Sequence, residues 1–237
     1  MDAHHLSNRL LKVANYVPRN ARLADIGSDH AYLPAYLALN HQINFAIAGE
    51  VVRGPYLNAV NEVKKENLED RIFPRLADGL DAIKFSDQVD TITICGMGGM
   101  LIKEILEKGQ KIIETHPLLI LQPNVGSDIL RAWLNSHQYE ILNEEILSED
   151  GHIYEIIVAR YTPKLLVKLS GKDLMFGQYL RHHQNAAFKE KWEKEIQKNQ
   201  KAISQMQKAN HVPKNRISQL QQENDYIEGV LKDGKSN

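Results

Sequence analysis

Between residues 21 and 137, short apolar runs alternate with longer amphipathic stretches, and this alternation restricts the possible folds more than any other feature. The runs read as strands because they are short, apolar and rich in β-branched residues. They cover residues 21–26, 44–48, 72–76, 91–95 and 118–121. Helical spacing covers residues 5–17, 31–40, 54–67, 99–113 and 126–137. Because strands that alternate with helices form right-handed βαβ units, the sequence predicts an α/β fold with a parallel sheet.

The next two strand candidates, residues 139–147 and 152–159, are joined differently. Only residues 148–151 separate them. A connection this short makes an antiparallel hairpin, since a parallel crossover needs a dozen or more residues. Five parallel strands followed by such a pair predict a Rossmann-like sheet of class I methyltransferase type, with seven mostly parallel strands and helices on both faces. The order of the strands in space is not visible in the sequence.

The composition changes after residue 160, and residues 171–210 have few apolar side chains and many Lys, Gln and Glu residues. The apolar side chains of this C-terminal part recur in two runs at spacings typical of a coiled-coil seam. They are Trp192, Ile196, Ile203 and Met206, then Ile217, Leu220, Ile227 and Leu231, with Asn224 at the omitted position of the second run. His211-Val212-Pro213 lies between the runs and would break a helix. We therefore predict an α/β domain over residues 1–162 and an antiparallel helical coiled-coil pair over residues 163–237.

The net charge of −1 hides an unequal distribution between these two parts. Residues 165–237 hold 13 Lys and Arg against 8 Asp and Glu, whereas residues 1–164 hold 16 against 22. A basic appendage on an acidic domain suggests an anionic partner, although a solvated lysine-rich helix surface accounts for the same numbers.

Several compositional features predict where the protein works. Cys95 is the one cysteine, so no intrachain disulfide can form, as in a reducing compartment. No apolar run approaches the roughly 20 residues of a membrane span, and the first residues lack the apolar core of a signal peptide. We expect a cytoplasmic protein without a membrane segment. The ten histidines are scattered, so we expect no metal site.

The first candidate strand ends at residues 25–30, Asp-Ile-Gly-Ser-Asp-His, at the sheet edge where Rossmann-like domains bind nucleotides. The dinucleotide motif G-x-G-x-x-G is absent, because Asp29 and Tyr32 stand at its second and third glycine positions. Asp29 would repel a pyrophosphate at the start of the next helix. Asp25 and Asp29 would instead attract the sulfonium and α-ammonium of S-adenosylmethionine, which favours this cofactor over NAD. Either acid could alternatively cap the following helix.

Three further strand ends carry residues that suit the same ligand. Glu50 ends the second strand, 23 residues after Gly27, and can accept hydrogen bonds from both ribose hydroxyls. Asp78, beside Gly79, could accept from the adenine amino group, although Asp-Gly is also an ordinary turn. After the fourth strand, three glycines within residues 96–99 indicate a loop where the backbone approaches a ligand.

The fifth strand ends in Gln122-Pro123-Asn124. Both amides offer donors and acceptors, as the reading of a base edge requires, and a Pro-Asn turn accounts for the same residues nearly as well. Cys95 and Met97 flank the first glycine of the preceding motif and are as readily explained by packing.

Together and in this order, these motifs resemble those of a known family. They are ADIGSDHAYLP (24–34), AGEV (48–51), ADGL (77–80), CGMGGMLI (95–102) and LQPN (121–124). They resemble the TrmK family of bacterial tRNA methyltransferases, which modify N1 of adenine 22, and the resemblance covers nearly the whole chain. It implies S-adenosylmethionine as the methyl donor, tRNA as the partner, and a coiled-coil tail that helps to hold the tRNA.

The motifs and the resemblance give two sets of candidate site residues. The cofactor-binding candidates are Asp25, Gly27, Asp29, His30, Glu50, Val51, Asp78, Gly79, Gly96 and Met97. The candidates near the target base are Asp29, Gly98, Gln122, Pro123 and Asn124. Asp29 and Asn124 are the candidate catalytic residues, since a carboxylate could stabilise the cationic methylated base or accept a proton.

N1 lies on the pairing edge of adenine, so the target nucleotide must be unpaired or flipped before the enzyme can reach it. Most of the binding energy for the RNA would then come from contacts to phosphates. The candidate phosphate ligands are Lys189, Lys191, Lys194, Lys198, Lys201 and Lys208.

Other functions fit parts of the same sequence. A methyltransferase for another RNA base, a protein or a small molecule is disfavoured by the basic tail. A non-catalytic tRNA-binding protein with a relic nucleotide fold is disfavoured by the intact set of Asp25, Gly27, Asp29 and Glu50. A dimerising tail is disfavoured by the short seam with Asn and Lys at core positions, so we expect a monomer.

Overall fold

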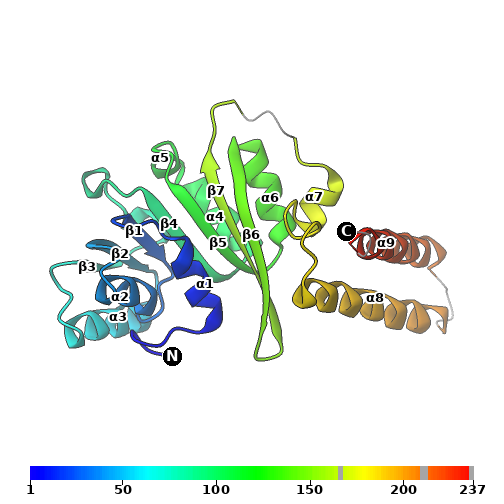
Figure 1. Cartoon of the computed structure of the whole chain (residues 1–237), viewed down its shortest axis with the longest axis horizontal. Helices are drawn as coiled ribbons and strands as arrows, with labels where there is room; N and C mark the ends of the chain where they lie inside the picture. Colours follow the sequence, from blue (N-terminus) through cyan, green and yellow to red (C-terminus); the bar gives the residue numbers. More distant parts are fainter. Residues whose placement is uncertain (165–167, 209–212, 235–237) are drawn as a thin grey trace.

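The protein is built around one sheet of seven strands, in the order β3-β2-β1-β4-β5-β7-β6 (Figure 1). The computed structural model describes residues 1–164, 168–208 and 213–234. The strands are β1 (Arg22–Ile26), β2 (Phe45–Glu50), β3 (Ile72–Leu76), β4 (Thr91–Gly98), β5 (Leu118–Val125), β6 (Tyr139–Glu149) and β7 (His152–Tyr161). Pairing is parallel except at β7, which is antiparallel to β5 and β6. The predicted seven-stranded, mostly parallel sheet is confirmed.

Helices cover both faces of the sheet because neighbouring strand residues point to opposite sides. Leu23, for example, packs in one core and Ala24 in the other. The first core includes α1 (Asn8–Tyr16), α2 (Tyr32–Leu39) and α3 (Arg53–Lys65). The second includes α4 (Gly99–Lys108), α5 (Gln110–Ile113) and α6 (Ser127–Ser136), with the 3₁₀ turn η1 (Gly79–Ala82), which is followed by η2 (Phe85–Asp87).

The prediction of one continuous helix over residues 99–113 is wrong in one respect. Gly109 divides this stretch into two helices, α4 and α5. A Cβ at Gly109 would lie 2.4 Å from Leu80 Cδ1. Glycine is therefore required where this turn packs against η1, a tertiary contact that helical periodicity does not reveal.

The β6–β7 hairpin is confirmed, with a tighter turn than the four residues predicted. Glu149 pairs with His152, so Asp150 and Gly151 alone form the connection. Both have positive φ, 51° and 77°, as in the type I′ turns that suit the twist of a hairpin.

Within residues 168–208 and 213–234 the structure has one helix more than predicted. A short helix, α7 (Gly171–Phe176), begins at a capping box in which Ser170 accepts from Asp173 N and Asp173 accepts from Ser170 N. It contacts α6. The predicted pair follows as α8 (Ala186–Gln207) and α9 (Lys214–Asp233), which we call the arm. The arm extends away from the sheet on the side of β6 (Figure 1).

The two arm helices pack on each other along the predicted seam. Near the outer end Ile203 packs with Ile217 and Leu220, and near the sheet Trp192 packs with Ile227, so the helices are antiparallel. The position that the apolar spacing omits in each run is an asparagine. Asn199 Nδ2 donates to Asn224 Oδ1 at 3.0 Å, and both residues are buried. A paired polar contact of this kind selects one register along a seam. Of the predicted helix-breaking residues, His211 and Val212 lie outside the described ones, and Pro213 directly precedes α9.

A buried ion network joins the arm to the sheet domain. Arg131 of α6 is fully buried, and its guanidinium donates to Glu144 Oε1 at 2.6 Å and to Glu155 Oε2 at 2.8 Å. Lys191 Nζ of α8 donates to the other oxygen of Glu155 at 2.5 Å. Burial opposes ionisation of Glu155, but the charges of Arg131 and Lys191 outweigh it and lower its pKa to about 2. The network therefore fixes the base of α8 against β7.

Candidate functional site

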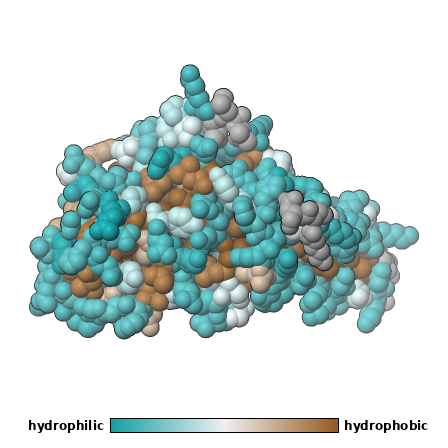
Figure 2. All heavy atoms as spheres, viewed as in Figure 1, coloured by the Kyte–Doolittle hydropathy of each residue, from teal (hydrophilic) through white to brown (hydrophobic). Residues whose placement is uncertain are grey.

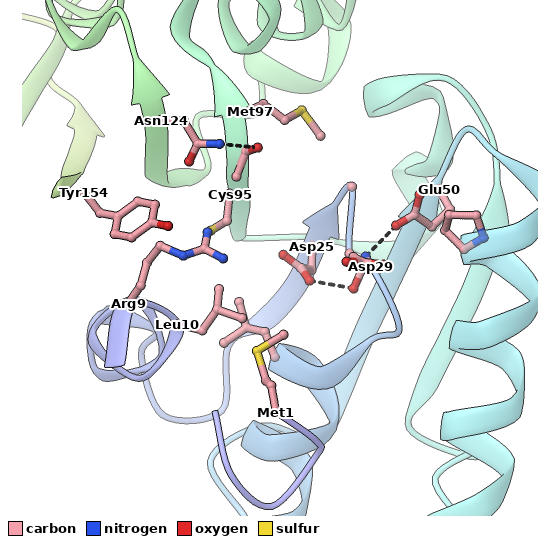
Figure 3. A pocket seen from close by; sticks show the side chains of 15 residues that line it. Met1, Arg9, Leu10, Asp25, Asp29, Glu50, Cys95, Met97, Asn124 and Tyr154 are labelled. Carbon is pink, nitrogen blue, oxygen red and sulfur yellow. Dashed lines mark hydrogen bonds between the residues drawn. The ribbon is translucent and has the colours of Figure 1, made fainter. Parts of the chain in front are cut away.

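A cavity of about 390 Å³ opens at the carboxyl ends of the parallel strands (Figure 3). It lies where the strand order reverses between β1 and β4, the usual ligand site of an open α/β sheet. Its lining includes six of the predicted cofactor residues, Asp25, Gly27, Asp29, Glu50, Gly96 and Met97. The lining also includes Asn124, which was predicted near the target base.

The loop after β1 has an unusual backbone. Gly27 has φ 70°, and Asp29, His30 and Ala31 follow with φ values of 34°, 67° and 56°. Such conformations cost non-glycine residues about 1–3 kcal/mol each and cluster at ligand sites. The N-cap of α2 is Ala31, which makes no side-chain cap hydrogen bond. The alternative in which Asp25 or Asp29 caps this helix is therefore excluded.

Asp25 forms the floor of the cavity and is almost fully buried. Its carboxylate accepts from Ser28 Oγ and Thr93 Oγ1, each at 2.6 Å. Burial raises the pKa of Asp25, and the two hydroxyl donors offset part of that effect. A cation that entered the cavity would favour the ionised carboxylate, so the site is suited to a positively charged group.

Glu50 is the second buried acid of the cavity. Its Oε1 accepts from Asp29 N at 2.5 Å, which holds the strained loop in place. Burial raises the pKa of Glu50, and the nearby charges of Asp25 and Asp29 add to the effect. Three carboxylates around one cavity produce a negative potential, which disfavours a pyrophosphate.

A hydrogen-bond network holds the loop after β4. Gln122 is fully buried, and its Oε1 accepts from Gly96 N at 3.0 Å and from Arg9 Nη1. Its Nε2 donates to Asn124 Oδ1 at 3.3 Å, and Asn124 Nδ2 donates to Gly96 O at 2.8 Å. In the structure the amide of Gln122 supports the loop and lies outside the cavity lining, whereas the sequence suggested that it reads a base edge. Asn124 remains at the lining.

Arg9 and Tyr154 line the cavity, and sequence analysis missed both. Arg9 extends from α1 toward Cys95, with its guanidinium 5.1 Å from the Tyr154 ring centre (Figure 3). Neither residue follows a parallel strand, so the strand-end argument could not find them. Cys95 also lines the cavity, and burial raises the pKa of its thiol, which is consistent with a packing role.

Besides Gln122, six other predicted residues at the strand ends lie outside the cavity lining: His30, Val51, Asp78, Gly79, Gly98 and Pro123. The Asp78 carboxylate is 62% exposed and lies 3.7 Å from Lys108 Nζ. Val51 is also 62% exposed. His30 stacks on Tyr32 with ring centres 5.0 Å apart.

The glycines after β4 serve two different needs. Gly96 lines the cavity with φ 78°. A Cβ at Gly99 would lie 2.1 Å from Gly126 O, so this glycine is required where the loops after β4 and β5 cross. The sequence suggested that all three glycines of residues 96–99 allow a ligand to approach the backbone. For Gly99 the structure gives a different reason, which is the packing of two loops against each other.

The arm lysines are not equivalent. Lys191, a predicted phosphate ligand, has its ammonium 2.5 Å from the buried Glu155 and is engaged in an ion pair within the protein. Lys194 pairs with Glu190 and Lys198 with Glu195 on the same helix, while the ammonium groups stay exposed. Lys201 is exposed and shares a shallow groove with Lys194 and Lys198. In the view of Figure 2 the surface over the arm is mostly hydrophilic.

None of the helices within residues 1–164, 168–208 and 213–234 combines the length and the apolar character that a bilayer span requires. Within the same ranges, no three or more His, Cys, Asp or Glu side chains come together as a metal ion would need.

The cavity fits S-adenosylmethionine by the chemistry of its groups. Buried Asp25 suits an ammonium, Glu50 at the end of β2 suits ribose hydroxyls, and Gly96 exposes backbone. A sheet that reverses its order between β1 and β4, with carboxylates at that point in place of a glycine-rich phosphate loop, defines a Rossmann-like methyltransferase.

Comparison with known proteins narrows this class to a family. The family model for TrmK, tRNA (adenine(22)-N(1))-methyltransferase, matches residues 23–228. A tRNA (adenine(22)-N(1))-methyltransferase of Bacillus subtilis (strain 168) is 42% identical over 220 residues, which cover 91% of this chain and 92% of that protein. The chain belongs to the TrmK family, and the resemblance predicted from its motifs is confirmed.

Solved structures agree with this assignment. A Streptococcus pneumoniae structure in complex with S-adenosyl-L-methionine has 43% identity and a TM-score of 0.87, covering 96% of this chain and 100% of that one. M. capricolum TrmK in complex with S-adenosyl-homocysteine has 30% identity and a TM-score of 0.82, covering 97% and 99%.

Proposed function

We propose that this chain transfers a methyl group from S-adenosylmethionine to N1 of adenine 22 in tRNA. The observation that carries the proposal is the cavity itself. The chain is a member of the TrmK family, and its cavity at the strand ends is lined by Asp25, Asp29, Glu50 and Asn124.

The residues of the cavity take complementary roles in this proposal. Asp25 binds the α-ammonium group and Glu50 the ribose hydroxyls, while S-adenosylmethionine supplies an electrophilic methyl group. Asn124, held by Gly96 O, and Asp29 at the mouth of the cavity face the incoming adenine. Adenine N1 carries a free lone pair, so positioning provides most of the effect, in favourable cases about 7–11 kcal/mol. The Asp29 carboxylate stabilises the cationic product or accepts a proton from its exocyclic amine.

The candidates outside the lining keep their predicted roles within the proposal. His30, Val51, Asp78 and Gly79 flank the adenosine of the cofactor, and Gly98 and Pro123 flank the target nucleotide. Residues 1–162 form the catalytic domain and residues 163–237 the part that holds tRNA. A family that acts on tRNA supports a cytoplasmic location. Because the two arm seams cover each other within one chain, we expect a monomer in sedimentation.

The proposed function is tested by nucleoside analysis. Unmodified tRNA is incubated with the protein and S-adenosylmethionine, digested, and examined by mass spectrometry. We expect one N1-methyladenosine per tRNA, and none in a tRNA with guanine at position 22. Methylation of another base, or methylation of the guanine-22 control, would refute the assigned target.

Cofactor binding should release protons when the pH approaches the raised pKa values of the two buried carboxyl groups. The pKa values of Asp25 and Glu50 are raised in the free protein, mainly by burial, and a bound cation favours their ionised forms. The affinity for S-adenosylmethionine should therefore fall as the pH is lowered from neutrality toward the raised pKa values of these two carboxyl groups. Calorimetry in two buffers of different ionisation heat measures the released protons. Asp25→Asn should reduce the release, and proton uptake in the wild type would contradict the prediction.

The lysines on the outer part of the arm should control RNA binding. Replacing Lys194, Lys198 and Lys201 by glutamine should weaken tRNA binding and reduce the slope of log K against log salt by about 2 to 3. Affinity for S-adenosylmethionine should not change, because these residues lie outside the cavity. Filter binding of tRNA at several salt concentrations measures this slope for the wild type and for the variant.

A matched control replaces three exposed lysines elsewhere, Lys64, Lys65 and Lys84. An equal loss in this control would show a general charge effect. Deletion of residues 165–237 is a weaker test than these substitutions. It would remove Lys191 and Phe188 and so expose the buried network and the apolar cluster at the base of the arm.

A further inference from the structure

We infer that Arg9 binds the α-carboxylate of S-adenosylmethionine, an inference that rests on the proposed function. Among the described side chains that line the cavity, Arg9 is the one permanent cation. The other charged side chains of the lining are the carboxylates of Asp25, Asp29 and Glu50.

The charge pattern of the cavity matches an amino acid. The amino-acid end of S-adenosylmethionine carries an ammonium and a carboxylate on the same carbon atom. Asp25 is complementary to the first group and repels the second. In Figure 3 the guanidinium of Arg9 and the carboxylate of Asp25 face the same space from opposite sides. An arginine can bind a carboxylate through two parallel hydrogen bonds, so this pair can hold both groups.

The guanidinium is already oriented before any ligand arrives. Nη1 donates to the buried Gln122 Oε1, and the plane lies near the Tyr154 ring. A guanidinium has five donors, so the bond to Gln122 leaves others for a ligand. A Cβ placed on Gly96 would lie 3.5 Å from Nη1, which shows that the group sits beside the exposed backbone of the β4 loop.

The helix that carries Arg9 is fixed to the β6–β7 hairpin. Glu149 accepts from Asn8 N at 2.6 Å and from Arg9 N at 3.2 Å, and so caps the first turn of α1. Near the other end of the helix, Tyr16 donates to Glu145 Oε1 at 3.0 Å. The hairpin therefore holds the first helix in the position that brings its cation to the cavity at the strand ends.

The test compares two ligands that differ by one group. S-adenosylmethionine and its decarboxylated form share the adenosine, the sulfonium and the ammonium, and only the first has a carboxylate. Calorimetry without tRNA gives the affinity of each. We expect the wild type to prefer S-adenosylmethionine about tenfold or more, the range of a charge-assisted hydrogen bond. Arg9→Met should remove this preference and leave the affinity for the decarboxylated ligand within about twofold.

Two further variants, together with tRNA binding by Arg9→Met, separate this role from others. Arg9→Lys should retain part of the preference, and Arg19→Met, on the exposed turn after α1, should retain all of it. If Arg9→Met lost affinity for both ligands equally, Arg9 would only support the loop through Gln122. Unchanged affinity for both, with weaker tRNA binding, would place Arg9 at a phosphate of the RNA. Either result, or a wild type without preference, overturns the inference. Failure of the proposed function would differ, because the wild type would then bind neither ligand or form no N1-methyladenosine.

Discussion

Replacement of Asp29 by asparagine should lower kcat about 100-fold or more at saturating S-adenosylmethionine, because an amide can neither accept a proton nor stabilise a cationic base. Asparagine is the informative replacement, since Asp29 has φ 34° and asparagine tolerates this region better than other side chains. The Asp29 backbone N–H would still donate to Glu50. Asp29→Ala should show the same loss, with added strain in the loop.

The measurements are the steady-state kcat of tRNA methylation at saturating S-adenosylmethionine and the dissociation constant of S-adenosylmethionine. The Asp29 side chain is 72% exposed, so its loss should weaken cofactor binding far less than it slows methylation. Asp70→Asn, an exposed acid distant from the cavity lining, serves as the control. A turnover rate within twofold of the wild type in Asp29→Asn would remove this residue from the chemistry.

The second large effect concerns stability. Replacing Arg131 by methionine should lower the free energy of unfolding by about 3–5 kcal/mol, because it leaves Glu144 and Glu155 buried without their main counter-charge. Arg131 also donates to Leu174 O at 3.1 Å, so the loss should loosen α7 and the base of the arm. Thermal denaturation should show a Tm about 10 °C lower.

Two controls make the Arg131 result specific. Arg160→Met removes an exposed arginine from β7, the strand that also carries Glu155, and should change the Tm little. Adding Glu144→Gln and Glu155→Gln to Arg131→Met should recover part of the stability, since neutral side chains cost less to bury. If Arg131→Met melted at the wild-type temperature, the network would be of no consequence for stability.

The free energy of unfolding at acidic pH tests the same network independently. The pKa of Glu155 lies at about 2, below its ordinary value of 4.5. A lowered carboxyl pKa stabilises the fold above the unfolded value, so this contribution is present at neutral pH and is lost as the pH falls from about 4.5 through 2. In Arg131→Met the free energy of unfolding should change less with pH over this interval than in the wild type.

The site was predictable to the extent that it lies at strand ends. Asp25, Gly27, Glu50 and Gly96 each follow a buried apolar run, and parallel strands bring such positions to one edge. Arg9 gave no such signal, because it stands on the polar face of an amphipathic helix. Gln122 carried the right signal for a different role, since the sequence does not tell whether an amide at a strand end points inward or outward.

Local periodicity determined the strands, the helices and the seam of the arm, because burial of one face imposes a period of two or 3.6 residues on neighbouring positions. The short hairpin connection likewise determined its antiparallel pairing. Only the tertiary structure decided the strand order, the break at Gly109, the pairing of Asn199 with Asn224, the burial of Arg131, and the ion pair of Lys191 with Glu155. These features depend on partners that lie far apart along the chain, and a one-dimensional pattern does not record which distant groups meet.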